Sequence, residues 1–302
     1  MNNNGPCFIS SYARIIIVIL TLIAVTPIRA QVKRALLVGI SEYNQSGNNS
    51  WKNIHGAEDL SIIVPILQRK GFRVTKLCNR YATASRIRNE LKKLISSCRS
   101  GDVVYLHFSC HGQPYEDFSG DEEDGWDESI IPYDAQMFYR KGIYEGKNHI
   151  IDDELNSSFH QIRKNIGEKG YLCIVIDACH AGGSSRGEES EEEEIFIRGT
   201  GIGFSPQGKA YRPRINATGH FQLSRAKGLS HVTILEACRS YQSNYEIRQN
   251  GRYYGPLSYY VFETISKYSI VPSLDWIYGI KRNMDADRRL TRQNMVYETS
   301  LK

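Results

Sequence analysis

The stretch Val103-Val104-Tyr105-Leu106-His107-Phe108-Ser109-Cys110-His111-Gly112 decides the fold, because an apolar run there ends abruptly in a polar segment. A second stretch has the same design: Tyr171-Leu172-Cys173-Ile174-Val175-Ile176 leads into Asp177-Ala178-Cys179-His180-Ala181-Gly182-Gly183. Short β-branched runs that are apolar on both faces are typical of buried strands in a parallel sheet. The sequence therefore predicts two buried strands, one leading to an imidazole and the other to a thiol.

Runs of the same kind alternate with segments of helical spacing along the rest of the chain. This alternation predicts an α/β fold, a three-layer sandwich with a mainly parallel central sheet and helices on both faces. Two long segments, 113–147 and 182–226, are interpreted as loops. The predicted strands are 35–40, 72–77, 103–108, 171–176 and 232–235, and the predicted helices are about 57–70, 85–98, 152–164, 257–266 and 274–284.

The first thirty residues predict a secretory signal peptide. Arg14 precedes an apolar stretch from Ile15 to Val25, and a small residue, Ala30, stands before Gln31. The stretch is shorter than the ~20 residues that cross a bilayer, although a retained signal anchor is the alternative. We therefore expect an exported protein (secreted, periplasmic or on the cell surface) with a mature chain of 31–302 and no membrane contact after the signal is removed.

Composition narrows the classes of partner and cofactor. The formal net charge is +5, and the Lys and Arg residues are scattered, so we expect no nucleic-acid partner. Cys7 leaves with the signal, and the six remaining cysteines show neither the paired spacing of a zinc site nor a disulfide framework. No redox or nucleotide cofactor is expected.

The imidazole and the thiol are predicted to meet. Ligand sites of open parallel sheets lie outside the carboxyl ends of the strands, and strands that follow each other in the chain are usually neighbours about 4.8 Å apart. His111 and Cys179 therefore face one crevice, where the His would act as general base for a nucleophilic Cys. The backbone amides of Gly112 and Cys179 are candidates for binding the oxyanion of a tetrahedral intermediate.

Carboxylates are predicted beside the thiol. Asp177 shares a side of the strand end with Cys179, and Asp59, in the first turn of the first predicted helix, emerges at the same edge of the sheet. A negative charge does not activate a thiol, because it raises the thiol pKa. These acids are better suited to neutralise a cation on the substrate, so they favour Arg or Lys.

At these residues the chain resembles the caspase and metacaspase family of cysteine peptidases, and it is closer to the metacaspase branch. The resemblance covers essentially the whole mature chain. It rests on Val38-Gly39-Ile40, Ile54-His55-Gly56-Ala57-Glu58-Asp59, the Ser-x-His-Gly segment at Ser109, Gly120-Asp121-Glu122-Glu123-Asp124-Gly125-Trp126-Asp127-Glu128, Asp152-Asp153-Glu154-Leu155, the Asp-x-Cys-His-x-Gly segment at Asp177 and Leu235-Glu236-Ala237-Cys238.

The resemblance implies a caspase-like domain and a cysteine endopeptidase that cuts after Arg or Lys. In this family pattern His111 is the general base and Cys179 the nucleophile. The residues that match the lining of the basic-residue pocket are Asp59, Ser109 and Asp177. Many metacaspases bind calcium through acids between the His and the Cys, and the matching residues here are Asp127, Asp152 and Asp153.

The resemblance also divides the mature chain into a large-subunit-like part (31–186), a linker loop (187–226) and a small-subunit-like part (227–302). The length and the basic residues of the loop after Cys179 suggest that the chain cuts itself there, with Arg186, Arg198 and Lys209 as candidate positions. A catalytically silent binding or scaffold protein, and a ligase that transfers the same acyl group to an amine, are the alternatives. The sequence leaves the oligomeric state open.

Overall fold

The computed structural model describes residues 30–45, 51–120, 122–180, 195–213, 223, 225–239 and 241–301. The chain divides into Met1–Gln31 and Val32–Lys302, and the fold described below is that of the second unit. The predicted signal peptide, apart from Ala30, and the candidate cut at Arg186 lie outside the described residues. Across the described ranges, we find no helix with both the length and the apolar character that a membrane crossing requires.

A six-stranded sheet forms the centre of the domain, with the strand order β11-β8-β7-β3-β1-β2. The pairs β1·β2, β1·β3, β3·β7 and β7·β8 are parallel, and β11 runs antiparallel to β8 at one edge. The mainly parallel α/β sheet predicted from the sequence is thus confirmed. The strands are β1 (Lys33–Gly39), β2 (Phe72–Cys78), β3 (Val103–Ser109), β7 (Tyr171–Asp177), β8 (His231–Glu236) and β11 (Val296–Thr299).

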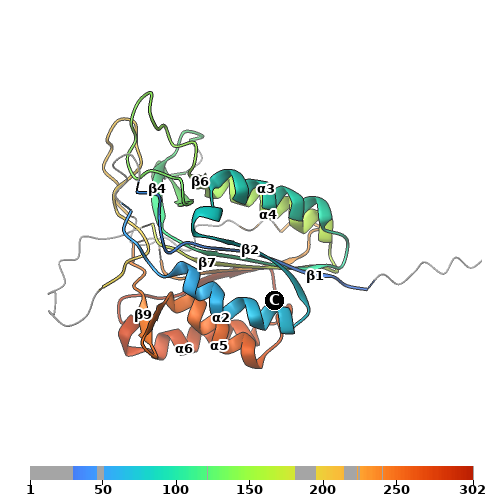
Figure 1. Ribbon diagram of the computed structural model, residues 1–302. Helices are drawn as coiled ribbons and strands as arrows, with labels where there is room; N and C mark the ends of the chain where they lie inside the picture. Colours follow the sequence, from blue (N-terminus) through green and yellow to red (C-terminus); the bar gives the residue numbers. More distant parts are fainter. Residues whose placement is uncertain are drawn as a thin grey trace, which may run out of the picture. The chain divides into compact units, whose positions relative to one another are not determined.

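Helices cover both faces of this sheet, as Figure 1 shows, with α3 and α4 on one face and α2, α5 and α6 on the other. Successive strand residues divide between the two layers: Leu106 and Phe108 belong to the core cluster of one face, and Tyr105 to that of the other. This period of two is the physical basis of the continuous apolar runs. The helices are α2 (Gly56–Arg69), α3 (Ala84–Ser97), α4 (Asp152–Ile166), α5 (Pro256–Lys267) and α6 (Asp275–Ala286), with short 3₁₀ turns at Asn79–Tyr81 and Arg288–Leu290.

The segment 113–147, predicted to be a loop, is instead partly a sheet. Strand β4 (Gly112–Glu116) pairs antiparallel with β5 (Trp126–Ile130), which pairs with β6 (Ile150–Ile151). β4 begins with Gly112 and contains Pro114, and β5 contains the charged pair Asp127 and Glu128, so neither strand shows the apolar alternation on which strand prediction depends. Ile130 and the following Ile131 are buried in the core, so the end of β5 is anchored to the central domain.

A second unpredicted pair lies in the C-terminal half. Strands β9 (Ile247–Gln249) and β10 (Arg252–Tyr254) form a hairpin around Asn250 and Gly251. Both turn residues have positive φ angles, 51° and 78°, as a two-residue hairpin turn requires. β4 and β9 lie at the end of the central sheet where its parallel strands terminate (Figure 1).

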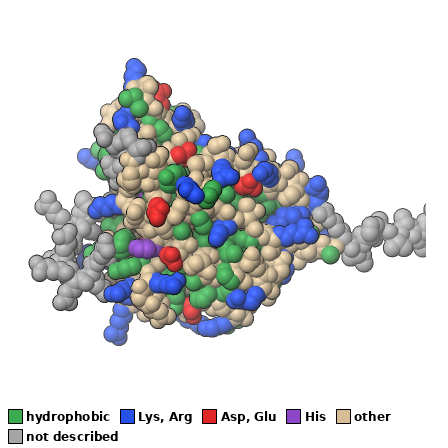
Figure 2. Space-filling view, in the orientation of Figure 1, with side chains coloured by type: hydrophobic (Ala, Val, Ile, Leu, Met, Phe, Trp, Pro, Cys, Tyr) green, Lys and Arg blue, Asp and Glu red, His purple; other side chains and the backbone are tan. Residues whose placement is uncertain are grey.

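Charged side chains are mixed on the surface. Figure 2 shows Lys and Arg over much of one face, with Asp and Glu interspersed among them. Their distribution agrees with the scattered positions of these residues in the sequence.

Candidate active site

The predicted catalytic pair lies at the carboxyl ends of adjacent strands. β3 and β7 pair in parallel up to Ser109 opposite Asp177, so His111 and Cys179 each follow two residues beyond the last pair. Both side chains are buried, at 3% and 1% exposure. The topology therefore brings the imidazole and the thiol to the same edge of the sheet.

The surroundings of His111 fix its tautomer. Nε2 lies 2.8 Å from the carbonyl oxygen of Lys52, and since a carbonyl only accepts, Nε2 carries the proton. Nδ1 is buried without a hydrogen-bond partner. Trp51 stacks on the ring with centroids 4.9 Å apart, and the backbone N–H of His111 donates to the Tyr43 hydroxyl at 2.7 Å. Burial lowers the pKa of His111 to about 4, so the ring is a neutral base at neutral pH.

The thiol of Cys179 is directed toward the loop that follows the neighbouring strand β8. Its Sγ donates to the carbonyl oxygen of Gln242 at 2.7 Å, and the Sγ of Cys238 approaches the same oxygen at 3.4 Å. The hydrogen bond between the two thiols, and burial, raise the pKa of Cys238 well above its ordinary value. The thiol proton is therefore directed to Gln242, and no hydrogen bond joins the sulfur to His111 Nδ1 in this structure.

The chain places one of its own peptide groups in the crevice. The carbonyl oxygen of Arg198 accepts hydrogen bonds from the amides of Cys179 at 2.9 Å and Gly112 at 3.3 Å. These two amides are the predicted oxyanion donors. The next residue, Gly199, fits because it has no side chain: a Cβ there would lie 1.8 Å from the Cys179 carbonyl oxygen.

The side chain of Arg198 fills an acidic pocket and is fully buried, with 0% exposure. Its Nη1 lies 2.6 Å from both Asp59 Oδ2 and Ser109 Oγ, and 3.7 Å from Asp177 Oδ1. Glu246 Oε1 is 2.9 Å from Nε and 2.8 Å from Nη2. The three residues predicted to line a basic-residue pocket therefore surround a guanidinium, together with a fourth, Glu246.

The charged groups of the pocket shift one another's pKa values. The pKa of Asp59 is raised to about 7, because burial, together with the neighbouring carboxylates of Asp177 and Glu246, outweighs the opposing effects of Arg198 and Ser109. Burial acts to raise the pKa of Glu246 too, but the guanidinium and His55 outweigh it and lower that pKa. Burial alone would lower the pKa of Arg198, yet the three acids raise it. The pocket therefore binds a fixed positive charge.

Asp177 is held mainly by the C-terminal half of the chain. Asn244 Nδ2 donates to one carboxylate oxygen at 2.7 Å, and the backbone N–H and Oγ of Ser258 both donate to the other at 2.7 Å. Gln293 Nε2 in turn donates to Asn244 Oδ1 at 2.8 Å. Because these donors engage both carboxylate oxygens of Asp177, this residue contributes charge and shape to the pocket. Asp59 instead makes the short contact with the guanidinium.

Comparison with known proteins decides the family. The model of the metacaspase peptidase C14 domain matches residues 33–185, which include the predicted base and nucleophile. The chain belongs to the metacaspase family. This metacaspase is 26% identical over 286 residues to Metacaspase-1 of Schizosaccharomyces pombe, covering 83% of this chain and 64% of that protein. It is 29% identical over 167 residues to Metacaspase-2 of Arabidopsis thaliana, covering 52% of this chain and 36% of that protein.

The metacaspase thus spans less than two thirds of the length of these relatives. A crystal structure of a Geobacter sulfurreducens protein superposes with a TM-score of 0.60 at 19% identity, covering 89% of this chain and 94% of that one. At that identity the likeness shows the fold, and it agrees with the caspase-like architecture expected from the sequence.

Sequence reasoning missed several residues of the site in this metacaspase. Glu246 and Asn244 follow β8, whose carboxyl end borders that of β7, so the rule that located His111 and Cys179 also pointed to this loop. Gly255 precedes α5 and donates its N–H to Asp59 Oδ1 at 3.0 Å. No periodic pattern marks these positions, because they lie in irregular segments.

The acids matching the family's calcium ligands lie near one another. Asp127 and Asp152 are both 3% exposed, and Asp152 Oδ1 is buried without a hydrogen-bond partner. Burial, and after it the carboxylates of Glu128, Asp127 and Asp153, raise the pKa of Asp152 to about 8. Among the residues described, no three such side chains converge closely enough to enclose a metal. The orphaned oxygen and the mutual repulsion nevertheless fit a hard cation.

Of the candidate cleavage residues, Arg198 alone is described inside the pocket. Lys209 lies on the surface, with its Nζ 5.3 Å from the centroid of the Trp126 ring.

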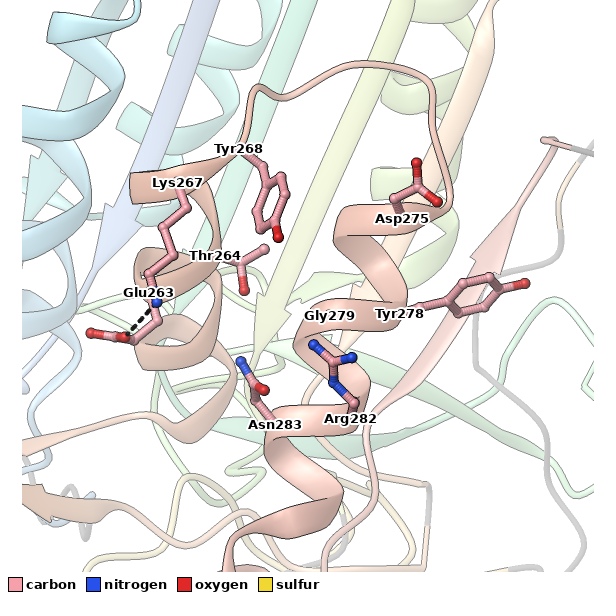
Figure 3. Close-up of a pocket in the computed structure, with 9 residues that line it drawn as sticks. All are labelled: Glu263, Thr264, Lys267, Tyr268, Asp275, Tyr278, Gly279, Arg282 and Asn283. Atoms are coloured by element: carbon pink, nitrogen blue, oxygen red, sulfur yellow. Dashed lines mark ion pairs between the residues drawn. The ribbon is translucent and has the colours of Figure 1, made fainter.

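A separate cavity of about 510 Å³ opens between α5 and α6. Thr264, Tyr268, Arg282 and Asn283 line this space, and Lys267 pairs with Glu263 at its side (Figure 3). No residue of the pocket around Arg198 lines this cavity.

Proposed function

We propose that this metacaspase is a cysteine endopeptidase that cuts peptide bonds after Arg or Lys. The observation that carries the proposal is the position of Arg198. Its carbonyl oxygen lies between two backbone donors next to Cys179, and its guanidinium lies among Asp59, Asp177 and Glu246. A bond after a basic residue is thus presented to the nucleophile in the manner of a substrate.

The residues assign the steps of the reaction. After rotating away from Gln242, Cys179 Sγ attacks the carbonyl carbon while His111 Nδ1 takes the thiol proton. The amides of Gly112 and Cys179 stabilise the oxyanion. His111 then returns the proton to the departing amine, and water resolves the acyl-enzyme with the same imidazole as base. The neutral state of His111 suits it to accept the first proton.

The same arrangement leads us to propose self-cleavage at the bond between Arg198 and Gly199. The bond is already seated, so the reaction is intramolecular and its orientation is established before the chemical step. Lys209, which is exposed against Trp126, is accessible for cleavage by a second molecule. The cut at Arg186 remains a prediction outside the described residues.

Fluorogenic peptides ending in Arg, Lys or Asp test the proposal. We expect turnover of the Arg and Lys peptides, and a loss of at least about 1000-fold in the Cys179→Ala variant. Cys78→Ala is the matched control, because this half-buried thiol lies at the end of β2. Added amines report any transfer of the acyl group to an acceptor other than water. Turnover that survives in Cys179→Ala, or turnover of the Asp peptide alone, contradicts the proposal.

N-terminal sequencing of the stored protein tests processing. Self-cleavage predicts a fragment beginning at Gly199 in the wild type and its absence in Cys179→Ala. The same measurement tests export, which we propose from the N-terminal sequence, because signal removal predicts a chain beginning at Gln31. An intact chain with full activity contradicts self-cleavage.

We further propose that calcium binds Asp127, Asp152 and Asp153. When bound, the ion supplies positive charge that offsets the repulsion among these carboxylates. Calorimetric titration of the Cys179→Ala protein with CaCl₂ should show binding that Asp152→Asn weakens at least about tenfold, since that substitution removes one ligand charge. Glu90→Gln is the control, because Glu90 is a carboxylate on α3 paired with Lys93. Equal affinities in Asp152→Asn and Glu90→Gln contradict this set of ligands.

A further inference from the structure

The chain segment that carries Arg198 makes contacts beyond the acidic pocket. Phe196 accepts a backbone hydrogen bond from the N–H of Glu246 at 3.0 Å, and the N–H of Arg198 donates to the carbonyl of Asn244 at 3.0 Å. Ile197, between them, forms an antiparallel bridge with Tyr245. Residues 196–198 are therefore extended along the loop after β8, and the side chains of Phe196 and Arg198 project to the same side.

An aromatic slot receives Phe196. Its ring lies edge-on to His55, with centroids 4.6 Å apart at 90°, and tilted toward Tyr253, at 4.8 Å and 66°. His55 and Tyr253 stack on each other at 5.0 Å and 25°. Edge-to-face contacts at these distances are the favourable arrangement of aromatic rings. The slot thus selects by shape and ring orientation, whereas the acidic pocket selects by charge.

The slot is held in place by the same carboxylate that contacts Arg198. The backbone N–H of His55 donates to Glu246 Oε1 at 2.7 Å, and Nδ1 of His55 lies 2.5 Å from Oε2. The side chain of Glu246 has 0% exposure. His55 also directly precedes α2, whose first turn carries Asp59. One buried acid therefore connects the wall of the slot to the pocket for the basic residue.

We propose that a second subsite, formed by His55 and Tyr253, selects an aromatic residue two positions before the basic residue at which the chain is cut. The proposal rests on the proposed function and extends it to a substrate class, peptides of the pattern aromatic-x-Arg. Ile197, at the middle position, lines a cavity of about 260 Å³ together with Trp51, Ile54 and Met137. Apolar residues fit there.

The test compares acetyl-Phe-Ile-Arg and acetyl-Ala-Ile-Arg coumarin amides. The wild type should show a kcat/KM about tenfold higher for the Phe peptide, since two edge-to-face contacts are lost with Ala. Tyr253→Ala should reduce that ratio to about threefold, because one of the two contacts remains. Tyr268→Ala, which alters a tyrosine with 55% exposure on the α5–α6 cavity, should keep the wild-type ratio. Equal rates for the two peptides in the wild type overturn the subsite.

A binding measurement separates the subsite from the chemistry. The Cys179→Ala, Phe196→Ala, Arg198→Ala triple variant has neither the nucleophile nor the two tethered side chains that fill the slot and the acidic pocket, so a fluorescein-labelled Phe-Ile-Arg peptide can enter. Anisotropy should give a Kd about tenfold lower for this peptide than for Ala-Ile-Arg. A tenfold binding preference without any turnover by the wild type overturns the proposed function and leaves the subsite supported. Turnover of both peptides with equal Kd values overturns the subsite and leaves the proposed function standing.

Discussion

Replacing Arg198 by Ala should prevent self-cleavage at this position and at the same time open the site to other substrates. The guanidinium makes short contacts with Asp59, Ser109 and Glu246 and is fully buried. Removing one partner of such a buried pair costs about 3–5 kcal/mol. At 1.4 kcal/mol for each factor of ten, the seated state loses about two to three and a half orders of magnitude in population relative to the open state, in which the segment has left the pocket.

Progress curves with an acetyl-Phe-Ile-Arg substrate measure this effect. The wild type should show a lag that follows the appearance of the fragment beginning at Gly199 on a gel. Arg198→Ala should remain intact at this bond and start at its full rate. Lys209→Ala is the matched control, because Lys209 is a basic residue of the same loop that lies on the surface, and its lag should persist. A lag of wild-type length in Arg198→Ala, or a cut before Gly199 in that variant, refutes the reasoning.

Three further outcomes follow from the pocket. Glu246→Gln should lower kcat/KM for an Arg peptide about 10- to 100-fold, because charge-assisted hydrogen bonds to the guanidinium are lost. The loss should be smaller for a Lys peptide, because the Lys side chain is one bond shorter. Equal losses for the two peptides contradict this role of Glu246. The pKa of Asp59, raised mainly by burial, is about 7, and protonation removes the charge of its carboxylate. The pH–rate profile of the wild type should therefore fall about tenfold per unit below pH 7, whereas that of Asp59→Asn should stay flat. The pKa of His111, lowered to about 4, lies outside this window. Gly199→Ala should slow self-cleavage at least about tenfold, because the Cβ of the new alanine would meet the Cys179 carbonyl oxygen. The rate is measured by gel densitometry, and an unchanged rate excludes this clash.

The sequence predicted the central architecture because buried parallel strands and amphipathic helices carry strong periodic signals. The predicted strand at 103–108 corresponds to β3, Val103–Ser109, and the predicted helix at 152–164 to α4, Asp152–Ile166. His111 and Cys179 followed from one topological rule, that loops after neighbouring parallel strands converge. The same rule applied to β8 also places Cys238 beside Cys179, as the structure has it.

The features that the sequence did not predict lie in segments without a periodic pattern of apolar residues. The path of the loop after β8 decides that Glu246 reaches both Arg198 and His55, and no spacing pattern encodes that path. The hairpin β9–β10 carries a local signal, the turn dipeptide Asn250-Gly251, but its strands are too short to show an alternating pattern beside that turn. Arg198 was predicted as a residue to be cut, whereas its position in the predicted basic-residue pocket required the three-dimensional structure.

The pairing of β7 with β8 gives a cut chain a particular fate. The bond after Arg198 lies between these strands in the sequence, yet they run side by side from Tyr171 opposite His231 to Ile176 opposite Glu236. Scission would therefore yield a non-covalent heterodimer that elutes as one particle from a sizing column and separates in denaturant. Its reassembly would be second order, so the recovery of the folded protein after denaturation would depend on concentration once the bond is broken.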